Sequence, residues 1–91
     1  MFFMICYDII DDARRRRMQK LLEGYGERVQ YSVFECDISD SQYRALKGKV
    51  LSSIDTDEDS VRVYPLCRTC TGKIEFNGNG NTTKNEHFFI I

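Results

Sequence analysis

The chain has 91 residues, of which 42% are hydrophobic, and its 13 basic and 14 acidic residues give a formal net charge of −1. This length allows one domain with a thin core, for which dimerisation would be a natural supplement, and the hydrophobic content excludes a disordered chain. The near-neutral charge is unusual for a nucleic-acid-binding protein, although it leaves room for a locally basic surface.

The first apolar run covers residues 2–10 and predicts a central β-strand covered on both faces. The run is too short for a signal peptide or a membrane span, and no later segment is long enough. We therefore expect a cytoplasmic protein without a membrane partner, in which the four cysteines are thiols rather than disulfides.

A helix is predicted directly after this strand. Asp11 and Asp12 are good N-cap residues. Apolar residues then recur at helical spacing until two glycines end the pattern, and these positions are Met18, Leu21, Leu22 and Tyr25, with Gly24 and Gly26.

The segment 27–38, ERVQYSVFECDI, predicts β-structure and is long for one strand. It is either one bent strand or a tight hairpin that turns near Ser32. Ser39 and Gln42 then form the pattern of a capping box. A second helix follows, with an apolar stripe at Tyr43, Leu46, Val50 and Ile54.

The last third of the chain predicts strands and turns. Residues 55–59 form an acidic loop, and residues 60–66 form a strand with Pro65 near its end. A short strand at 73–76 and a turn-rich segment at 77–85 precede a terminal apolar strand at 86–91. That strand needs a sheet to join, in this chain or in a neighbour.

The order β-α-β(-β)-α-β matches a split βαβ, ferredoxin-like fold, an α/β protein of the α+β sandwich type. We expect one domain over residues 1–91, with a core at 1–66 and a strand tail at 71–91. Because this fold hosts many functions, the function has to be inferred from the site.

Asp8 lies at the end of the first predicted strand, a position where open α/β sheets place ligands. A carboxylate there suits Mg²⁺ or Mn²⁺, and a twofold dimer could bring two copies of Asp8 together. The alternative is a turn or cap residue. Asp11 and Asp12 are more simply explained as helix caps.

Arginines occupy positions 14–17, at the start of the first helix. Arg14 shares the apolar face and therefore needs a carboxylate partner, either Asp8 or a neighbouring acid. Arg15 and Arg17 flank that face and could hold phosphates, whereas Arg16 points to solvent. A solvated charged helix face is the alternative, although cations at a helix start oppose the helix dipole.

Cys67 and Cys70 form a C-R-T-C pair, a spacing found in zinc sites and in redox sites. No second such pair is present in the sequence, so ordinary loop thiols are the simplest interpretation. The alternative is a zinc ion shared by two protomers, with Cys67 and Cys70 from each. Cys6 and Cys36 fall in predicted strands and fit a core. His87, the single histidine, is a weak candidate for a general base and fits a surface strand position better.

The motif YDI at residues 7–9, the arginine-rich helix and the segment GYGERVQYSVFEC at 24–36 resemble the CRISPR-associated Cas-two family. The resemblance covers residues 1–66. It implies a ferredoxin-like homodimer in which the terminal strand pairs across the dimer. It also implies metal-dependent cleavage of RNA or double-stranded DNA, and a role as the central dimer of a spacer-integration complex with the Cas-one integrase.

The same resemblance assigns roles to single residues. It implies that Asp8, preceded by Tyr7, is the catalytic Mg²⁺ ligand. It further implies that nucleic acid is bound by Tyr7, Arg15, Arg17, Arg28 and Phe34. The alternative role of Phe34 is packing in the core or in a dimer interface, and the alternative role of Arg28 is an ion pair. The cysteine pair departs from the family pattern.

Two functions compete for this surface. In the first, paired Asp8 carboxylates hold Mg²⁺ and support hydrolysis of a phosphodiester. In the second, the basic helices bind duplex DNA through its backbone and the terminal strands dock the integrase. We favour the adaptor, because one carboxylate per chain without an obvious base is a small catalytic set. A zinc or redox module is the third alternative.

Overall fold

Six elements in the order β-α-β-β-α-β form the body of the protein, and short elements follow them. The computed structural model describes residues 1–76 and 89–90. The elements are β1 (Phe2–Asp8), α1 (Asp12–Glu23), β2 (Glu27–Gln30), β3 (Val33–Asp37), α2 (Asp40–Ser53), β4 (Ser60–Leu66), α3 (Arg68–Thr71), β5 (Glu75–Phe76) and β6 (Phe89–Ile90).

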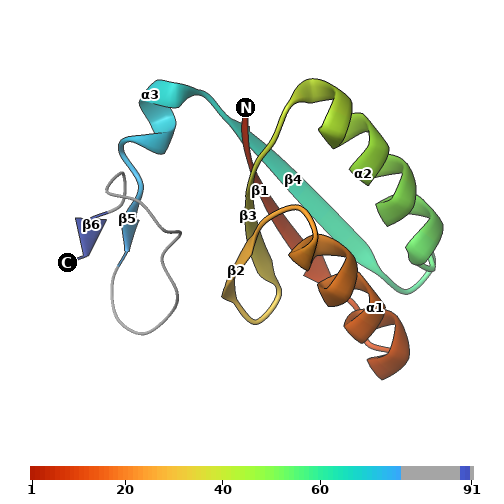
Figure 1. Ribbon diagram of the computed structural model, residues 1–91. Coiled ribbons are helices and arrows are strands. Elements are labelled where there is room, and N and C mark those ends of the chain that lie inside the picture. Colours follow the sequence, from red (N-terminus) through yellow and green to blue (C-terminus); the bar gives the residue numbers. More distant parts are fainter. Residues whose placement is uncertain (77–88, 91) are drawn as a thin grey trace.

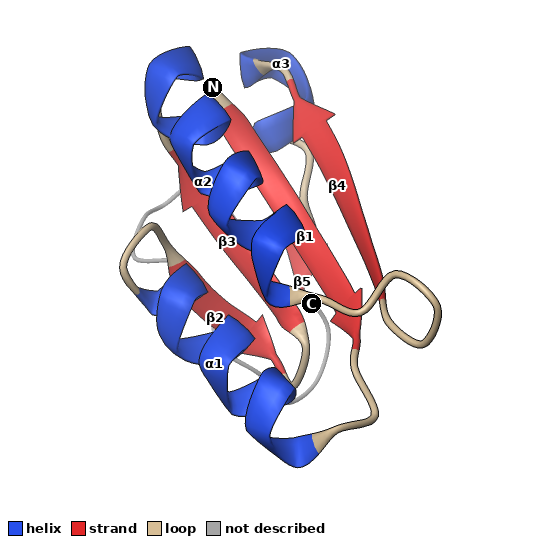
Figure 2. Cartoon of the chain, turned by 90° about the vertical axis from the view of Figure 1, so that its right-hand side faces the viewer, coloured by secondary structure: helices blue, strands red, loops and turns tan. Residues whose placement is uncertain are grey.

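The first four strands form an antiparallel sheet with the order β2-β3-β1-β4. Helices α1 and α2 lie side by side on one face of this sheet, as Figures 1 and 2 show from two directions. This is the split βαβ arrangement that the element order predicts. It places β1 at the centre of the sheet, between β3 and β4.

Local signals set the helix ends. The side chain of Asp11 caps α1 by accepting a hydrogen bond from the Arg14 N–H at 2.9 Å, and Gly24 ends the helix. In α2 both halves of the predicted capping box are present between Ser39 and Gln42. The cap residues predicted for both helices are thus confirmed, with Asp11 rather than Asp12 as the cap of α1.

The long segment 27–38 is a hairpin rather than one bent strand. Strands β2 and β3 pair antiparallel around Tyr31 and Ser32, which we call the hairpin tip. The register shifts between Arg28 and Gln30, an irregularity that increases the local twist. Gly26 precedes the hairpin where no side chain fits, because a Cβ atom would lie 2.2 Å from the Glu35 carbonyl oxygen.

The core lies between the sheet and the two helices. Its fully buried side chains are Phe34, Ile5, Met18, Leu22, Leu46 and Cys36. Tyr43 of α2 stacks on Phe3 of β1 with ring centroids 4.2 Å apart. The apolar stripes predicted for both helices therefore face the core.

The opposite face of the sheet bears on the prediction that the first strand is covered on both faces, and Phe2 of this face is buried. Among the described residues, no helix packs on the face that carries Met4, Cys6, Val33 and Tyr64, which we call the open face (Figure 1). Met4 and Cys6 are half-buried and Tyr64 is exposed. The strand ends at Asp8, as predicted for this residue.

The C-terminal elements differ from the predicted pattern in one respect. The four-residue helix α3 was not predicted, whereas β5 falls within the short strand expected at 73–76. β5 pairs in parallel with β6, so part of the terminal strand joins a two-stranded sheet in this chain. The turn-rich segment and His87 lie outside the described residues. None of the described helices is long and apolar enough for a membrane span.

Candidate metal and nucleic-acid site

Asp8 is the last residue of β1 and its side chain is exposed. Side chains alternate along a strand, so Asp8 lies on the open face with Met4 and Cys6, whereas Tyr7 points towards the helices. Within residues 1–76 and 89–90, no group bonds to the Asp8 carboxylate, and no three acidic, cysteine or histidine side chains gather as a metal site. One protomer therefore offers a single free carboxylate at this position.

Tyr7 fastens the hairpin tip to the end of β1. Its N–H donates to the Ser32 carbonyl oxygen at 3.0 Å, and its hydroxyl donates to the Tyr31 carbonyl oxygen at 3.4 Å. Burial raises the pKa of Tyr7, and the nearby charges of Arg28 and Arg15 oppose that rise. The buried ring therefore acts on the site through the backbone that it holds.

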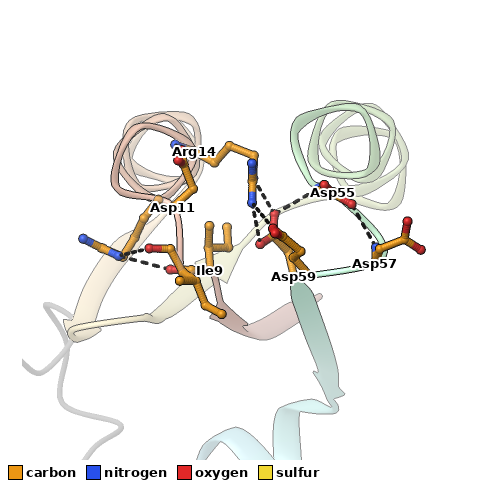
Figure 3. Close-up of polar contacts among 9 residues, drawn as sticks. Ile9, Asp11, Arg14, Asp55, Asp57 and Asp59 are labelled. Carbon is orange, nitrogen blue, oxygen red and sulfur yellow. Dashed lines mark hydrogen bonds and ion pairs between the residues drawn. The ribbon is translucent and has the colours of Figure 1, made fainter.

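Arg14 has a carboxylate partner, as predicted, but the partner is Asp59 and not Asp8. The Arg14 Nε atom lies 2.8 Å from Asp59 Oδ2, and Figure 3 shows this pair between the two helix ends. The Asp55 N–H also donates to Asp59 Oδ2 at 2.9 Å. These contacts fix the loop that leads into Ser60, the residue opposite Asp8 in β4.

Arg15 holds the connection between β1 and α1. Its guanidinium group donates to the carbonyl oxygens of Ile9 at 3.1 Å and Ile10 at 3.2 Å, and it pairs with Asp12. Arg17 is exposed and makes no bond to another side chain of the described residues. Arg15 thus shapes the turn after Asp8, whereas Arg17 is available to a phosphate.

Arg28 and Phe34 come from the hairpin and lie in different surroundings. Arg28 is exposed, and its guanidinium carbon lies 6.0 Å from the centroid of the Tyr31 ring. Phe34 is fully buried and neighbours the Tyr7 ring, at 6.3 Å between centroids. A ring that is fully buried in the chain offers no face to a base, so the geometry supports the packing role that the sequence left open for Phe34.

Two residues of this region had not been singled out. Asp59 was part of an acidic loop, and its burial with two hydrogen bonds from Arg14 distinguishes it from its neighbours. Tyr31 has an 89% exposed side chain at the hairpin tip. The sequence contained one sign of this position. A hairpin turn near Ser32, the alternative to one bent strand, would place Tyr31 at the tip of the hairpin.

Together these residues bring a free carboxylate and cations to one end of the sheet. Arg15 binds the carbonyl oxygens of the two residues that follow Asp8, Ile9 and Ile10, and Arg28 lies in the neighbouring hairpin on β2. An exposed carboxylate that no described residue bonds fits Mg²⁺ or Mn²⁺, since Mg²⁺ takes only one or two protein carboxylates. Such a set can bind a phosphodiester.

Comparisons with known proteins identify the family. Residues 1–74 match the family described as CRISPR associated protein Cas2. A protein of Synechocystis sp. named CRISPR-associated endoribonuclease Cas2 3 is 45% identical over 82 residues, which cover 90% of this chain and 89% of the relative. The chain belongs to the Cas2 family.

Solved Cas2 structures share the fold. The crystal structure of Streptococcus pyogenes Cas2 is 32% identical with a TM-score of 0.78, and the match covers 86% of this chain and 100% of that one. A chain of a partial Cas6-RT-Cas1–Cas2 complex is 33% identical with a TM-score of 0.68, covering 79% of this chain and 84% of that one. The ferredoxin-like fold expected from the element order is thereby confirmed for this Cas2 chain.

The cysteine pair of this Cas2 chain lies at α3. The Cys70 N–H donates to the Cys67 sulfur at 3.4 Å, and both thiols are exposed. No third potential ligand joins them among the described residues, so these residues of one protomer do not make a zinc site. Cys36 is buried in the core, as predicted, and Cys6 lies half-buried on the open face.

Proposed function

We propose that this Cas2 chain acts as a homodimeric nucleic-acid-binding adaptor in CRISPR spacer acquisition, and that its Asp8 pair supports Mg²⁺-dependent phosphodiester cleavage of RNA or double-stranded DNA. The observation that carries the proposal is an exposed Asp8, to which no described residue bonds, directly before the β1–α1 connection that Arg15 holds. Family membership supports both halves, since relatives are named endoribonucleases and one similar chain belongs to a complex with Cas1.

The open face supports the dimer. It presents apolar side chains that no described helix covers, including half-buried Met4, Cys6 and Val33. A second copy of the chain would cover this face and enlarge the core, which is thin in a chain of this length. Asp8 lies on the same face, so twofold pairing there would bring the two carboxylates towards a shared seam. The tail at 71–91 is proposed to pair with the partner protomer.

In the cleavage reaction each part of the site has a separate task. Asp8 and its partner copy would hold Mg²⁺, or Mn²⁺ in its place, and the metal would supply an activated water and neutralise phosphate charge. Arg17 and Arg28 hold phosphates through charge-assisted hydrogen bonds. Arg15 and Tyr7 keep the turn and the hairpin tip in place around Asp8 through their hydrogen bonds to the backbone.

In the adaptor role the same cations bind the DNA backbone without reading its sequence. Asp8 takes no part in that contact, because phosphates are repelled by a carboxylate. The proposed partner is the Cas1 integrase, which is supported by the similarity to a chain of the Cas1–Cas2 complex.

Substitution of Asp8 by Asn separates the two activities. We expect Asp8→Asn to lose Mg²⁺-dependent cleavage of labelled RNA and duplex DNA, to bind both at least as tightly as the parent protein, and to support spacer integration with the integrase. Asp37→Asn is the matched control, because Asp37 is also an exposed aspartate at a strand end but lies at the opposite end of the sheet. Cleavage by Asp8→Asn at the parental rate would refute the metal role, and loss of integration would refute the adaptor role.

The dimer has its own test. Met4→Lys places a charge on the open face and should convert a dimer into a monomer, measured by analytical ultracentrifugation. Leu51→Lys is the control, since Leu51 is an exposed apolar residue of α2. A parent protein that sediments as a monomer, or a Met4→Lys variant that stays dimeric, would contradict pairing through this face.

A further inference from the structure

We infer that Cys67 and Cys70 form a redox site, in which the two thiols are converted reversibly into a disulfide by exchange with a low-molecular-weight disulfide. The function proposed for Asp8 and the arginines does not use these cysteines, so the inference goes beyond that function and stands independently of it. It gives a role to the C-R-T-C motif, for which the nucleic-acid chemistry has no use.

Accessibility separates these two cysteines from the others. Cys67 and Cys70 are exposed, whereas Cys6 is half-buried and Cys36 is buried. Thiol–disulfide exchange requires direct contact between the attacking sulfur and a sulfur of the small disulfide, so it depends on access to the thiol. Of the four thiols, the C-R-T-C pair is therefore the one that a small molecule in solution reaches.

The two thiols also lie close to each other. The Cys70 N–H donates to the Cys67 sulfur at 3.4 Å, which turns that sulfur towards its partner residue. The two side chains are hydrogen-bonded to each other as well. Residues three positions apart on a helical turn are neighbours, so a disulfide between them needs a small closure of this turn and no rearrangement of the fold.

The turn that carries the pair is held by bonds that do not involve sulfur. The Thr71 N–H and the Thr71 hydroxyl both donate to the Cys67 carbonyl oxygen at 2.9 Å. The Gly72 N–H donates to the Arg68 carbonyl oxygen at 3.2 Å. Because oxidation of the thiols removes none of these bonds, the turn keeps the two sulfurs together in both redox states.

The two cysteines have different tasks in the exchange. The Cys67 sulfur accepts the Cys70 N–H, and this contact stabilises a thiolate and lowers the pKa of Cys67. The hydrogen bond between the two side chains raises the pKa of the Cys70 thiol. Since the thiolate is the nucleophile, Cys67 is the attacking thiol and Cys70 is the resolving thiol.

The exchange has two steps. The Cys67 thiolate attacks one sulfur of the small disulfide, a mixed disulfide forms at Cys67, and the other half of the molecule leaves as a thiolate. Cys70 then loses its proton to water and attacks the Cys67 sulfur, so that the Cys67–Cys70 bond forms and the second half leaves as a thiolate. Two electrons pass from the cysteine pair to the small disulfide, which is reduced to two thiols. An excess of the reduced small thiol reverses both steps.

The position of the pair shows which part of the protein oxidation affects. Ser60 begins β4 opposite Asp8, whereas Leu66 ends β4 opposite Phe2 and leads directly into Cys67. Helix α3 connects the four-stranded sheet to β5 (Figure 1). A disulfide here closes a ring within that connection, at the end of β4 that is remote from Asp8.

The test uses the full-length reduced protein with glutathione disulfide at neutral pH. Trypsin cleaves after Arg68, between the two cysteines, so a Cys67–Cys70 disulfide joins two peptides that reduction separates. We expect mass spectrometry to find this joined pair, to find Cys6 and Cys36 as free thiols, and to find both exposed thiols restored by an excess of reduced glutathione.

Three results would overturn the inference. The first is a lasting glutathione adduct on the parent protein, since Cys70 would then not resolve it. The second is a set of four unchanged thiols, or a disulfide that joins other cysteines or two chains. The third is a zinc ion in the purified protein that the cysteine pairs of two protomers bind, because the thiols would then be metal ligands.

Single-cysteine variants separate the two steps. Cys70→Ser lacks the resolving thiol, so the glutathione adduct at Cys67 should accumulate and persist. Cys67→Ser should form an adduct at Cys70 about 3- to 10-fold more slowly, since the remaining thiol has the smaller thiolate fraction. Cys6→Ala is the control and should form the Cys67–Cys70 disulfide like the parent protein. Equal rates of adduct formation in the two serine variants would overturn the assignment of Cys67 as the attacking thiol.

Discussion

The guanidinium group of Arg14 holds the carboxylate of Asp59 through two hydrogen bonds, from Nε to Oδ2 at 2.8 Å and from Nη2 to Oδ1 at 3.2 Å. The Asp59 side chain is 0% exposed and that of Arg14 is 22% exposed. The pair joins the start of α1 to the loop before β4, across 45 positions of the chain. It thereby fixes one side of the strand end that carries Asp8.

Removal of either partner should destabilise the protein. Arg14→Ala leaves the Asp59 carboxylate in place without its cation, so we expect it to lower Tm more than Asp59→Asn, which removes the charge and keeps a polar side chain. The matched control is Arg16→Ala, because Arg16 is an exposed arginine of the same helix turn. Thermal unfolding followed by circular dichroism measures all three; equal Tm values for Arg14→Ala and Arg16→Ala would contradict the role of the pair.

The same pair predicts a pH dependence. The hydrogen bonds from Arg14 lower the pKa of Asp59 below its usual 3.8. A depressed pKa in the folded state stabilises the protein above the unfolded value and ceases to do so as the pH falls through the folded value. The Tm difference between parent and Asp59→Asn should therefore be constant from neutral pH to about pH 5 and shrink below pH 4. A difference that grows on acidification would contradict it.

Two glycines with different surroundings form a second prediction. A Cβ atom on Gly26 would lie 2.2 Å from the Glu35 carbonyl oxygen and 2.6 Å from the Cys36 sulfur, whereas one on Gly48 meets nothing within 4 Å. Gly26→Ala should lower the free energy of unfolding by about 1–3 kcal/mol or more. Gly48→Ala, in the middle of α2, should raise it by about 0.5–1 kcal/mol, since glycine is a poor helix former. Urea denaturation measures the free energy of unfolding of both variants, and equal m-values make the two comparable with the parent protein.

A third prediction separates the arginines of α1. Arg17 is free to bind a phosphate, so Arg17→Ala should weaken duplex binding for all sequences and lower the salt slope by about 1 for each phosphate that Arg17 neutralises. Arg15 instead holds the Ile9 and Ile10 carbonyl oxygens. Arg15→Ala should therefore also lower Tm, which Arg17→Ala should not. Equal salt slopes for Arg17→Ala and the parent protein, from titrations at several salt concentrations, would remove Arg17 from the interface.

The thiols give a fourth prediction. The N–H of Cys70 lowers the pKa of Cys67, the hydrogen bond between the two side chains raises the pKa of the Cys70 thiol, and burial raises the pKa of Cys36 to about 11. Since the thiolate is the reactive form, iodoacetamide at neutral pH should modify Cys67 first and Cys36 last. Peptide mass spectrometry over time gives the order. Cys70→Ala keeps the backbone N–H, so Cys67 should remain the most reactive thiol; faster labelling of Cys36 would contradict the assignment.

The parts of the fold that could be predicted are those that local chemistry determines. The Asp11 cap, the Ser39–Gln42 capping box and both apolar helix stripes depend on residues a few positions apart. The turn of the hairpin stayed open because Tyr31 and Ser32 carry none of the glycine or asparagine signals of a tight turn. Helix α3 is too short to show a helical period.

The site shows the same division. Asp8 and the arginines were found from a motif and a charge cluster, but their different tasks depend on tertiary contacts. Arg14 was expected to need an acid, yet only the folded chain shows that Asp59 rather than Asp8 supplies it. Arg15 and Arg17 look equivalent on a helix, and they differ because the carbonyl oxygens of the β1–α1 connection lie within reach of Arg15 alone.

Tyr7 and Asp8 are consecutive residues of β1, one turned to the helices and one to the open face. Deletion or insertion of a single amino acid upstream in this strand would exchange their directions, sending a negative charge inward and an aromatic ring outward. Folding and chemistry would then fail in the same molecule. Evolution can vary the identity of the residues before the carboxylate, but it has little freedom to vary their number.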